Sequence, residues 1–244
     1  MTTALPSTGL IKITGHIADY RCKRSRANFI FSDGDQTAFG VVAVAAGIAG
    51  LSGQAISTAA NASSMEEEAD YVEFQLAGKV AKGWVWHSPF KNGEAVEVAA
   101  EWQVDHYEIA GILRPADRVL ALYPHCSRGR TTHVKNSVKW WLLGTTLFML
   151  GLALLILLSR GFEKFLPYFA RQGRGNLVWL IPYAFFGLMT FSMTRKWMPF
   201  VRLAEKVFTT LGLPNPSNID LIKSSKAQRK PTDPGEYGIF YFRY

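Results

Sequence analysis

Two long apolar runs interrupt a chain whose earlier part alternates apolar and polar residues. The first run, residues 140–158, contains no charged side chain and opens with Trp140 and Trp141. At the helical rise of about 1.5 Å per residue it would extend roughly 28 Å, close to the thickness of the hydrocarbon core of a bilayer. Because the run is apolar on every face, it predicts a transmembrane helix rather than a core helix of a soluble domain.

The second run, residues 177–193, is apolar but includes proline, glycine and several hydroxyl side chains. Membrane helices tolerate proline and glycine, because a neighbouring helix can satisfy the freed backbone groups and pack closely. We therefore predict a transmembrane hairpin over residues 128–196, with spans at 140–158 and 177–193. The expected packing and interfacial residues are Trp140, Trp141, Gly144, Gly151, Pro182 and Gly187.

Positive charge gathers around these runs and predicts their orientation. The net charge of +8 comes from 27 Lys and Arg against 19 Asp and Glu. More of the cations flank the outer ends of the two runs than lie in the connector between them, which favours cytoplasmic N- and C-termini in a bacterial inner membrane. The cations expected at the membrane surface are Arg128, Arg130, Lys135, Lys139, Arg195 and Lys196.

The pattern changes to period two in residues 1–127. Residues 96–104 place Val96, Val98, Ala100, Trp102 and Val104 on one face of a strand, and further short apolar segments are separated by Gly, Pro, Asn and Asp. The class predicted is α+β, with a small antiparallel β-barrel or sandwich, OB-like or SH3-like, on the cytoplasmic side. Strands are expected to turn back near Gly78.

An Ala- and Gly-rich insertion at residues 39–64 interrupts this domain. It fits either an Ala-rich helix or excursion between two strands, or a second membrane-active element over residues 39–62. The weak partition of alanine and glycine into lipid favours the first interpretation.

Residues 197–244 form the third expected region. Phe200, Leu203, Ala204, Val207 and Phe208 recur at helical spacing with basic residues on the other side, which predicts an amphipathic helix along the cytoplasmic membrane surface. The aromatic tail, residues 238–244, is too apolar to extend into water, so we expect it to dock on the barrel as an extra strand.

Candidate chemistry is sparse, and the sequence predicts no enzyme, cofactor or metal site. His125 and Cys126 could meet His16, Cys22 or His87 at a metal, but no ligand spacing supports this. The carboxylates between residues 94 and 108 fall mostly on the expected solvent face of a strand, with no sign of a buried one. Phe29 and Phe31 beside a basic run could stack nucleic-acid bases, yet they fit a core strand equally well, and the predicted membrane attachment favours lipid over nucleic acid.

Residues 83–141 carry a resemblance to a known family. The matching motifs are "PFKNG" (89–93), "AEWQ" (100–103), "RPAD" (114–117) and "ALYPHCSRGR" (121–130), together with the closing residues 224–244. They resemble a family of bacterial membrane proteins described as type VI secretion system effectors. The resemblance covers much of the chain outside the Ala-rich insertion. It implies a role in competition between Gram-negative bacteria and brings no catalytic residues.

Two functions are compatible with these expectations. The first is a type VI effector that self-associates in the inner membrane and creates a leak without enzymatic chemistry. The alternative is a membrane-anchored immunity or accessory protein, whose β domain binds a secretion component or a cognate partner. The few polar residues within the spans are typical of an anchor rather than a channel wall: Thr145, Thr146, Tyr183, Thr190 and Ser192.

Overall fold

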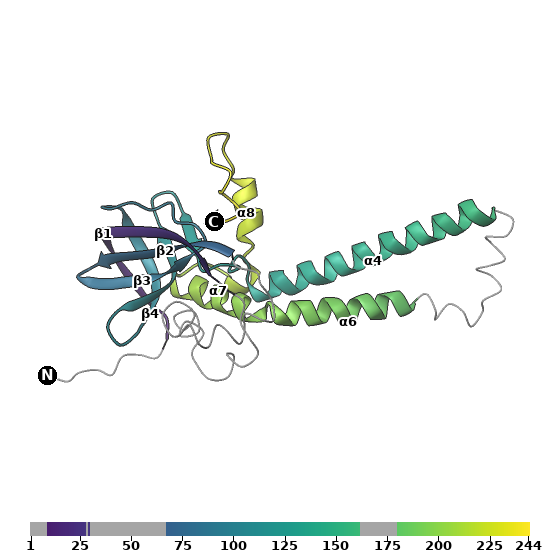
Figure 1. Cartoon of the computed structure of the whole chain (residues 1–244), viewed down its shortest axis with the longest axis horizontal. Coiled ribbons are helices and arrows are strands. Elements are labelled where there is room, and N and C mark those ends of the chain that lie inside the picture. Colours follow the sequence, from purple (N-terminus) through teal and green to yellow (C-terminus); the bar gives the residue numbers. More distant parts are fainter. Residues whose placement is uncertain (1–8, 28, 30–66, 162–179) are drawn as a thin grey trace. The chain divides into compact units, whose positions relative to one another are not determined.

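The computed structural model describes residues 9–27, 29, 67–161 and 180–244, which fall into two compact units. The barrel unit combines Met1–Arg130 with Pro199–Tyr244, and the helical unit is Thr131–Met198 (Figure 1). The region expected as a separate C-terminal part therefore completes the barrel unit instead. The insertion predicted at residues 39–64 lies outside the described residues.

The barrel unit contains a small closed β-barrel, which confirms the prediction of an α+β fold with a small barrel. In the described part of the chain the strands lie in the order β3-β2-β1-β4-β5-β6-β7, and a further parallel pairing of β3 with β5 closes the first five strands. The barrel therefore contains one parallel pairing among antiparallel ones. The strands are β1 (Ile11–Ala27), β2 (Glu67–Leu76), β3 (Lys79–Val85), β4 (Ala95–Trp102), β5 (Tyr107–Arg114), β6 (Val119–Leu122) and β7 (Phe242–Arg243).

Strand β1 belongs to both sides of the barrel because it is long and irregular at its centre. Its first half pairs with β4 and its second half with β2, and the register shifts between Ala18 and Arg21. Asp19 has a φ of 52° at this shift. Such an irregularity bends a strand and increases its twist, which lets one strand close a barrel.

Turn chemistry and alternation explain much of the rest. Ala77 and Gly78 have φ values of 50° and 74° between β2 and β3, so the hairpin predicted near Gly78 is confirmed. Val96 and Val98 are buried as expected, but Trp102 is 37% exposed and Val104 is 95% exposed. The expected alternation fails at Trp102 because the pairing of β4 with β5 shifts register after Ala99, and Val104 lies beyond the end of β4 in the turn to β5.

Helix α7 (Met198–Thr210) covers β5 and corrects one expectation. A Cβ atom on Gly111 of β5 would lie 2.7 Å from Val207 of α7, so α7 can pack this closely because residue 111 is a glycine. The apolar side predicted for this helix is correct, but it packs into the barrel unit and is not available to lipid. Its buried residues are Phe200, Val201, Leu203, Ala204, Val207 and Phe208.

The C-terminal tail completes the sheet, as predicted. Strand β7 pairs with β6, placing Phe242 opposite Leu120. Before it come the short helices η2 (Pro216–Asn218) and α8 (Leu221–Ala227), and Asp220 caps α8 by accepting a hydrogen bond from the Lys223 N–H. The Tyr237 hydroxyl donates to the Ser225 carbonyl at 3.0 Å, which ties the tail to α8.

The helical unit consists, in its described part, of α4 and α6. Helix α4 (Arg130–Arg160) has 31 residues and α6 (Leu180–Lys196) has 17. Among the described residues, one helix, Arg130–Ser159, is long and apolar enough to cross a membrane by length and composition. The first residues of the second predicted span, 177–179, lie outside the described part, and α6 as described is too short to count as a spanning helix by the same measure.

Candidate functional site

The two helices of the helical unit pack against each other in antiparallel fashion. The indole Nε1 of Trp141 donates a hydrogen bond to the Tyr183 carbonyl at 3.1 Å. A Cβ atom on Gly187 would lie 3.0 Å from the same indole, so the absence of a side chain allows this contact. The Thr146 and Tyr183 hydroxyls are also hydrogen-bonded, at 3.0 Å. Trp141 and Gly187, both predicted as packing residues, are therefore brought together.

The other predicted packing residues lie elsewhere. Trp140 is 64% exposed, and nothing lies within 4 Å of a Cβ built on Gly144 or Gly151. The reason is periodicity: among the described residues, α4 buries Thr145 and Met149, which share a helix face with Trp141 at a spacing of four. Pro182 lies at the described beginning of α6, so its predicted kink depends on residues outside the described part.

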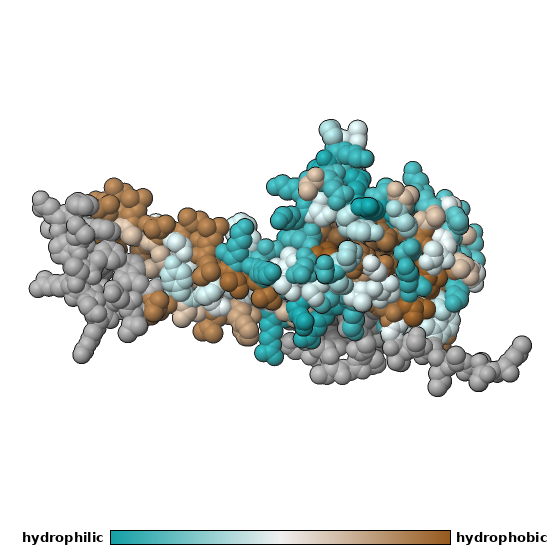
Figure 2. Space-filling view, turned by 180° about the vertical axis from the view of Figure 1, so that it is seen from behind, coloured by the Kyte–Doolittle hydropathy of each residue, from teal (hydrophilic) through white to brown (hydrophobic). Residues whose placement is uncertain are grey.

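Apart from this contact face, the helices expose apolar side chains. No residue of α6 is buried, and only 11% of the most apolar stretch of α4 is buried. Figure 2 shows brown, hydrophobic surface over much of the helical unit and mostly teal or white surface over the barrel unit. An apolar surface this extended is typical of contact with lipid or another protein. The largest exposed side chains include Leu147, Leu150, Leu154, Leu155, Leu158, Ile181, Phe185, Leu188 and Phe191.

Four of the six cations predicted at the membrane surface border this apolar surface. Lys135 and Lys139 are exposed near the start of α4, and Arg195 and Lys196 are exposed at the end of α6. A contact of 3.4 Å between the His133 ring and the Thr194 carbonyl places these two helix ends together. The cations therefore gather at one end of the helix pair, where basic residues meet lipid headgroups in membrane proteins.

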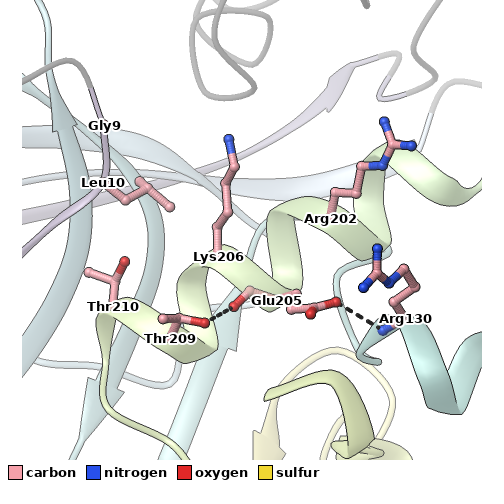
Figure 3. Close-up of a pocket in the computed structure, with 8 residues that line it drawn as sticks. All are labelled: Gly9, Leu10, Arg130, Arg202, Glu205, Lys206, Thr209 and Thr210. Atoms are coloured by element: carbon pink, nitrogen blue, oxygen red, sulfur yellow. Dashed lines mark hydrogen bonds between the residues drawn. The ribbon is translucent and has the colours of Figure 1, made fainter. Parts of the chain in front are cut away.

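The remaining two predicted cations belong to the barrel unit. Arg128 forms an ion pair with Asp220 at 3.3 Å, so its charge is already matched within the protein. Arg130 lines an open pocket of about 540 Å³ (Figure 3). The other lining residues are Gly9, Leu10, Arg202, Glu205, Lys206, Thr209 and Thr210. Only a weak signal in the sequence points to this pocket, because its walls come from three separate segments.

The single carboxylate of the pocket is held by neighbouring donors. Glu205 accepts a hydrogen bond from the backbone N–H of Arg130 at 3.3 Å and another from the Ser217 hydroxyl. Thr209 donates its hydroxyl to the Glu205 backbone carbonyl at 2.8 Å. Within the described part of the chain, no ion pair involves Arg130, Arg202 or Lys206. The pocket therefore presents three cations around one hydrogen-bonded carboxylate.

The candidate metal ligands do not assemble. Among the described residues no group of three or more His, Cys, Asp or Glu side chains could hold a metal ion. Burial raises the pKa of the Cys126 thiol, and its Sγ donates to the Phe200 carbonyl at 3.3 Å. Burial lowers the pKa of His125, opposed by Glu67 at 2.9 Å. These contacts fit a packing role for both residues.

A buried carboxylate is a feature that the sequence interpretation missed. The sequence gives no sign of a buried carboxylate, but Glu108 is only 2% exposed because β5 is covered on both faces. Burial raises its pKa to about 7, although a hydrogen bond and charge from His106 and the charge of Lys82 oppose the shift. Its Oε1 has no hydrogen-bond partner among the described residues. Glu108 therefore carries a proton over much of the acidic range.

Two of the four cations in the basic run before Phe29 form ion pairs within the protein. Arg24 pairs with Glu68 and Asp70 across β1 and β2, at 3.4 Å and 3.1 Å, and Arg26 pairs with Glu68 at 3.2 Å. Phe29 is buried and packs edge-on against Trp84 and Tyr123, so it is a core residue rather than an exposed stacking platform. Phe31 lies outside the described part.

In comparisons with known proteins, no family model matches the sequence, and no curated protein or solved structure matches the chain significantly. The resemblance to type VI secretion effectors therefore stays a prediction.

Proposed function

We propose that this chain is an integral membrane protein in which α4 and α6 form a two-span anchor and the barrel unit is a non-enzymatic binding module. The module would lie on the cytoplasmic side of a bacterial inner membrane. The proposal rests on one observation above all, the return of the chain to the folded unit that it left.

The chain leaves the barrel unit at Arg130 and re-enters it at Pro199. After re-entry, α7 buries its apolar side in that unit and β7 pairs with β6. A folded unit with a polar surface stays on one side of a bilayer, because hydrocarbon offers its polar groups no hydrogen bonds. A crossing by α4 therefore requires a second crossing before the chain returns, and α6 is the apolar helix in the described part of that interval.

The dimensions of the second span are compatible with this arrangement. Residues 177–193 would extend about 26 Å as a helix, at the lower end of what crosses a bilayer. The exposed cations Lys135, Lys139, Arg195 and Lys196 border the apolar surface on the end joined to the barrel unit by the chain. An excess of Lys and Arg marks the cytoplasmic side, which supports a cytoplasmic barrel unit.

The anchor is favoured over the leak-forming effector by the polar groups of the helices. Thr146 and Tyr183 satisfy each other, and Thr145 is buried in the helix pair. A channel wall needs a stripe of polar groups facing water, and two helices alone cannot enclose an aqueous path. An immunity or accessory role, with the barrel unit binding a partner protein, needs no such stripe.

The test is expression of the full chain in a Gram-negative host, followed by alkaline carbonate extraction of the membranes. We expect the wild type to resist extraction. One arginine at a helix centre costs about 2.5 to 3.5 kcal/mol, which so apolar a run could offset, so the test variant carries two substitutions, Leu147→Arg and Leu150→Arg. This variant is expected to become extractable. A matched control, Val104→Arg with Ile239→Arg, changes two exposed apolar residues of the barrel unit and should stay in the membrane.

Cys22 reports the orientation without any added label site. It is exposed, whereas Cys126 is buried, so a membrane-impermeant maleimide should modify Cys22 alone. We expect no labelling in intact spheroplasts and full labelling after lysis. Labelling of intact spheroplasts would contradict the cytoplasmic orientation, and extraction of the wild type by carbonate would contradict the anchor. Loss of membrane potential after induction would instead favour the leak-forming effector.

A further inference from the structure

We propose that the pocket formed by Arg130, Arg202 and Lys206 is a binding site for a dissolved phosphate-bearing anion. The inference goes beyond the proposed anchoring function. It begins from the way in which the cations are placed. Figure 3 shows Arg202 and Lys206 extending to the same side of α7, with the side chain of Arg130 directed toward that of Arg202.

The arrangement costs free energy in the absence of an anion. Arg202 and Lys206 are four residues apart on α7, and like charges at this spacing destabilise a helix. Arg130 adds a third positive charge, and the carboxylate of Glu205 is already engaged by the Arg130 N–H and the Ser217 hydroxyl. An anion seated between the three cations would remove this repulsion, which gives the pocket a preference for negative charge.

Seven other cations of the barrel unit are placed differently. Each pairs with a carboxylate of the same unit, at 3.8 Å or less. The three pocket cations have no such partner within the described part of the chain, and all three line one cavity. The paired cations are Lys12, Arg24, Arg26, Lys82, Arg114, Arg128 and Arg243.

The donors suit phosphate in particular. Arginine presents a planar fork that matches two phosphate oxygens, and lysine adds a compact point charge. The Thr210 side chain also lines the pocket and brings a hydroxyl that can donate to an anion. A volume of about 540 Å³ is much larger than a single phosphate needs, so the ligand would carry a further group, and Leu10 offers that group an apolar wall.

The position of Arg130 on α4 favours a dissolved ligand over a lipid headgroup. Arg130 begins α4, and the apolar run of that helix begins at Trp140. Ten residues of helix extend about 15 Å, whereas a headgroup layer is roughly 5 to 8 Å thick. With α4 upright in the membrane, the Arg130 backbone lies outside the headgroup layer, although still within the reach of the surface potential. The lipid headgroup is therefore the alternative source of phosphate that the experiment must separate.

The experiment is calorimetric titration of the detergent-solubilised full chain with inorganic pyrophosphate. We expect saturable binding that weakens with added salt, because exposed charges are screened. Arg202→Gln and Lys206→Gln should each weaken it roughly tenfold, since each removes a charge-assisted hydrogen bond. Glu205→Gln keeps an acceptor for Arg130 and Ser217 but removes a negative charge, so it should strengthen binding. Lys226→Gln, which changes an exposed cation on α8, should leave binding unchanged.

A loss of affinity in all four variants, or no saturable binding by the wild type, would overturn the proposal. The opposite signs expected for Lys206→Gln and Glu205→Gln separate anion binding from a general loss of structure. A second titration in nanodiscs of phosphatidylcholine, with or without an equal share of phosphatidylglycerol, separates the two sources. Unchanged affinity supports the dissolved anion, and a pyrophosphate affinity lowered by phosphatidylglycerol would assign the pocket to lipid instead. The detergent titration does not require α4 to span a membrane. A result that contradicts the membrane anchor would therefore leave the test of anion binding intact.

Discussion

Only Trp197 separates helices α6 and α7 in the chain, but their apolar residues differ in burial. None of the residues of α6 is buried, whereas α7 buries six apolar side chains in the barrel unit. The two helices differ in pattern rather than in the kinds of residue they use. Helix α6 is apolar on all sides, and α7 has one apolar side and one charged side.

This difference shows what each unit requires of its surroundings. The barrel unit hides its apolar residues from water by itself, with β5 covered on both faces. The helical unit buries only the narrow face around Thr145 and Met149 and leaves the rest of its apolar surface to another medium. Since burial of apolar area is the main source of folding free energy, the barrel unit draws its stability from its own core, whereas the proposed anchor would gain that burial for the helical unit from lipid.

The sharpest test of this comparison is a pair of phenylalanine truncations. Phe208 of α7 is 0% exposed and Phe185 of α6 is 63% exposed. We expect Phe208→Ala to destabilise the barrel unit by about 3 to 5 kcal/mol, because it leaves a cavity in a packed core. Phe185→Ala should change stability by less than about 0.5 kcal/mol.

The measurement is chemical denaturation of the full chain in detergent micelles, followed by near-ultraviolet circular dichroism of the barrel aromatics. Equal effects of the two substitutions would break the comparison, since they would mean that α6 is also packed in a protein core.

Glu108 tests how dry the interior of the barrel unit is. Burial raises the pKa of Glu108 to about 7 from an ordinary value of 4.5. The folded state therefore keeps a proton that the unfolded state releases, and stability is lost as the pH rises from 4.5 to 7. The full loss is on the order of 3 kcal/mol, at about 1.4 kcal/mol for each unit of pKa.

Glu108→Gln removes this ionisation while keeping the shape of the side chain. We expect the stability of the variant, relative to the wild type, to increase by about 3 kcal/mol between pH 4.5 and pH 7.5 and then to level off. Denaturation midpoints across this range give the difference curve. A flat curve would show that water reaches the carboxylate and that the interior is less dry than its burial indicates.

The sequence correctly predicted the elements that depend on the local pattern of apolar, polar and turn residues. The apolar run at residues 140–158 lies within α4, the turn at Gly78 connects the hairpin of β2 and β3, and the apolar tail contains β7. It did not predict where the amphipathic side of α7 would pack, because lipid and a barrel both accept such a side. Likewise the burial of Glu108 was missed, because it depends on the closure of the barrel and on the packing of α7 against β5.

The basic pocket was beyond reach for a similar reason. Its residues come from the segment just before β1, the start of α4, and α7 from Arg202 to its end, and the first two are far from α7 in the chain. The available signal was the spacing of four between Arg202 and Lys206, but without the fold these two residues were indistinguishable from ordinary cations flanking a membrane helix.

The smallest expected effect comes from adding one methyl group to a glycine in each unit. A Cβ on Gly111 would lie 2.7 Å from Val207 and 2.8 Å from Leu122, whereas a Cβ on Gly144 would meet nothing within 4 Å. Gly111→Ala should therefore destabilise the barrel unit by about 1 to 3 kcal/mol through overpacking. Gly144→Ala adds a better helix former on an exposed face, so it should cause no loss. Thermal denaturation in detergent distinguishes the two, and a loss of stability in Gly144→Ala would mean that this face of α4 is packed against a partner, as self-association in the membrane would require.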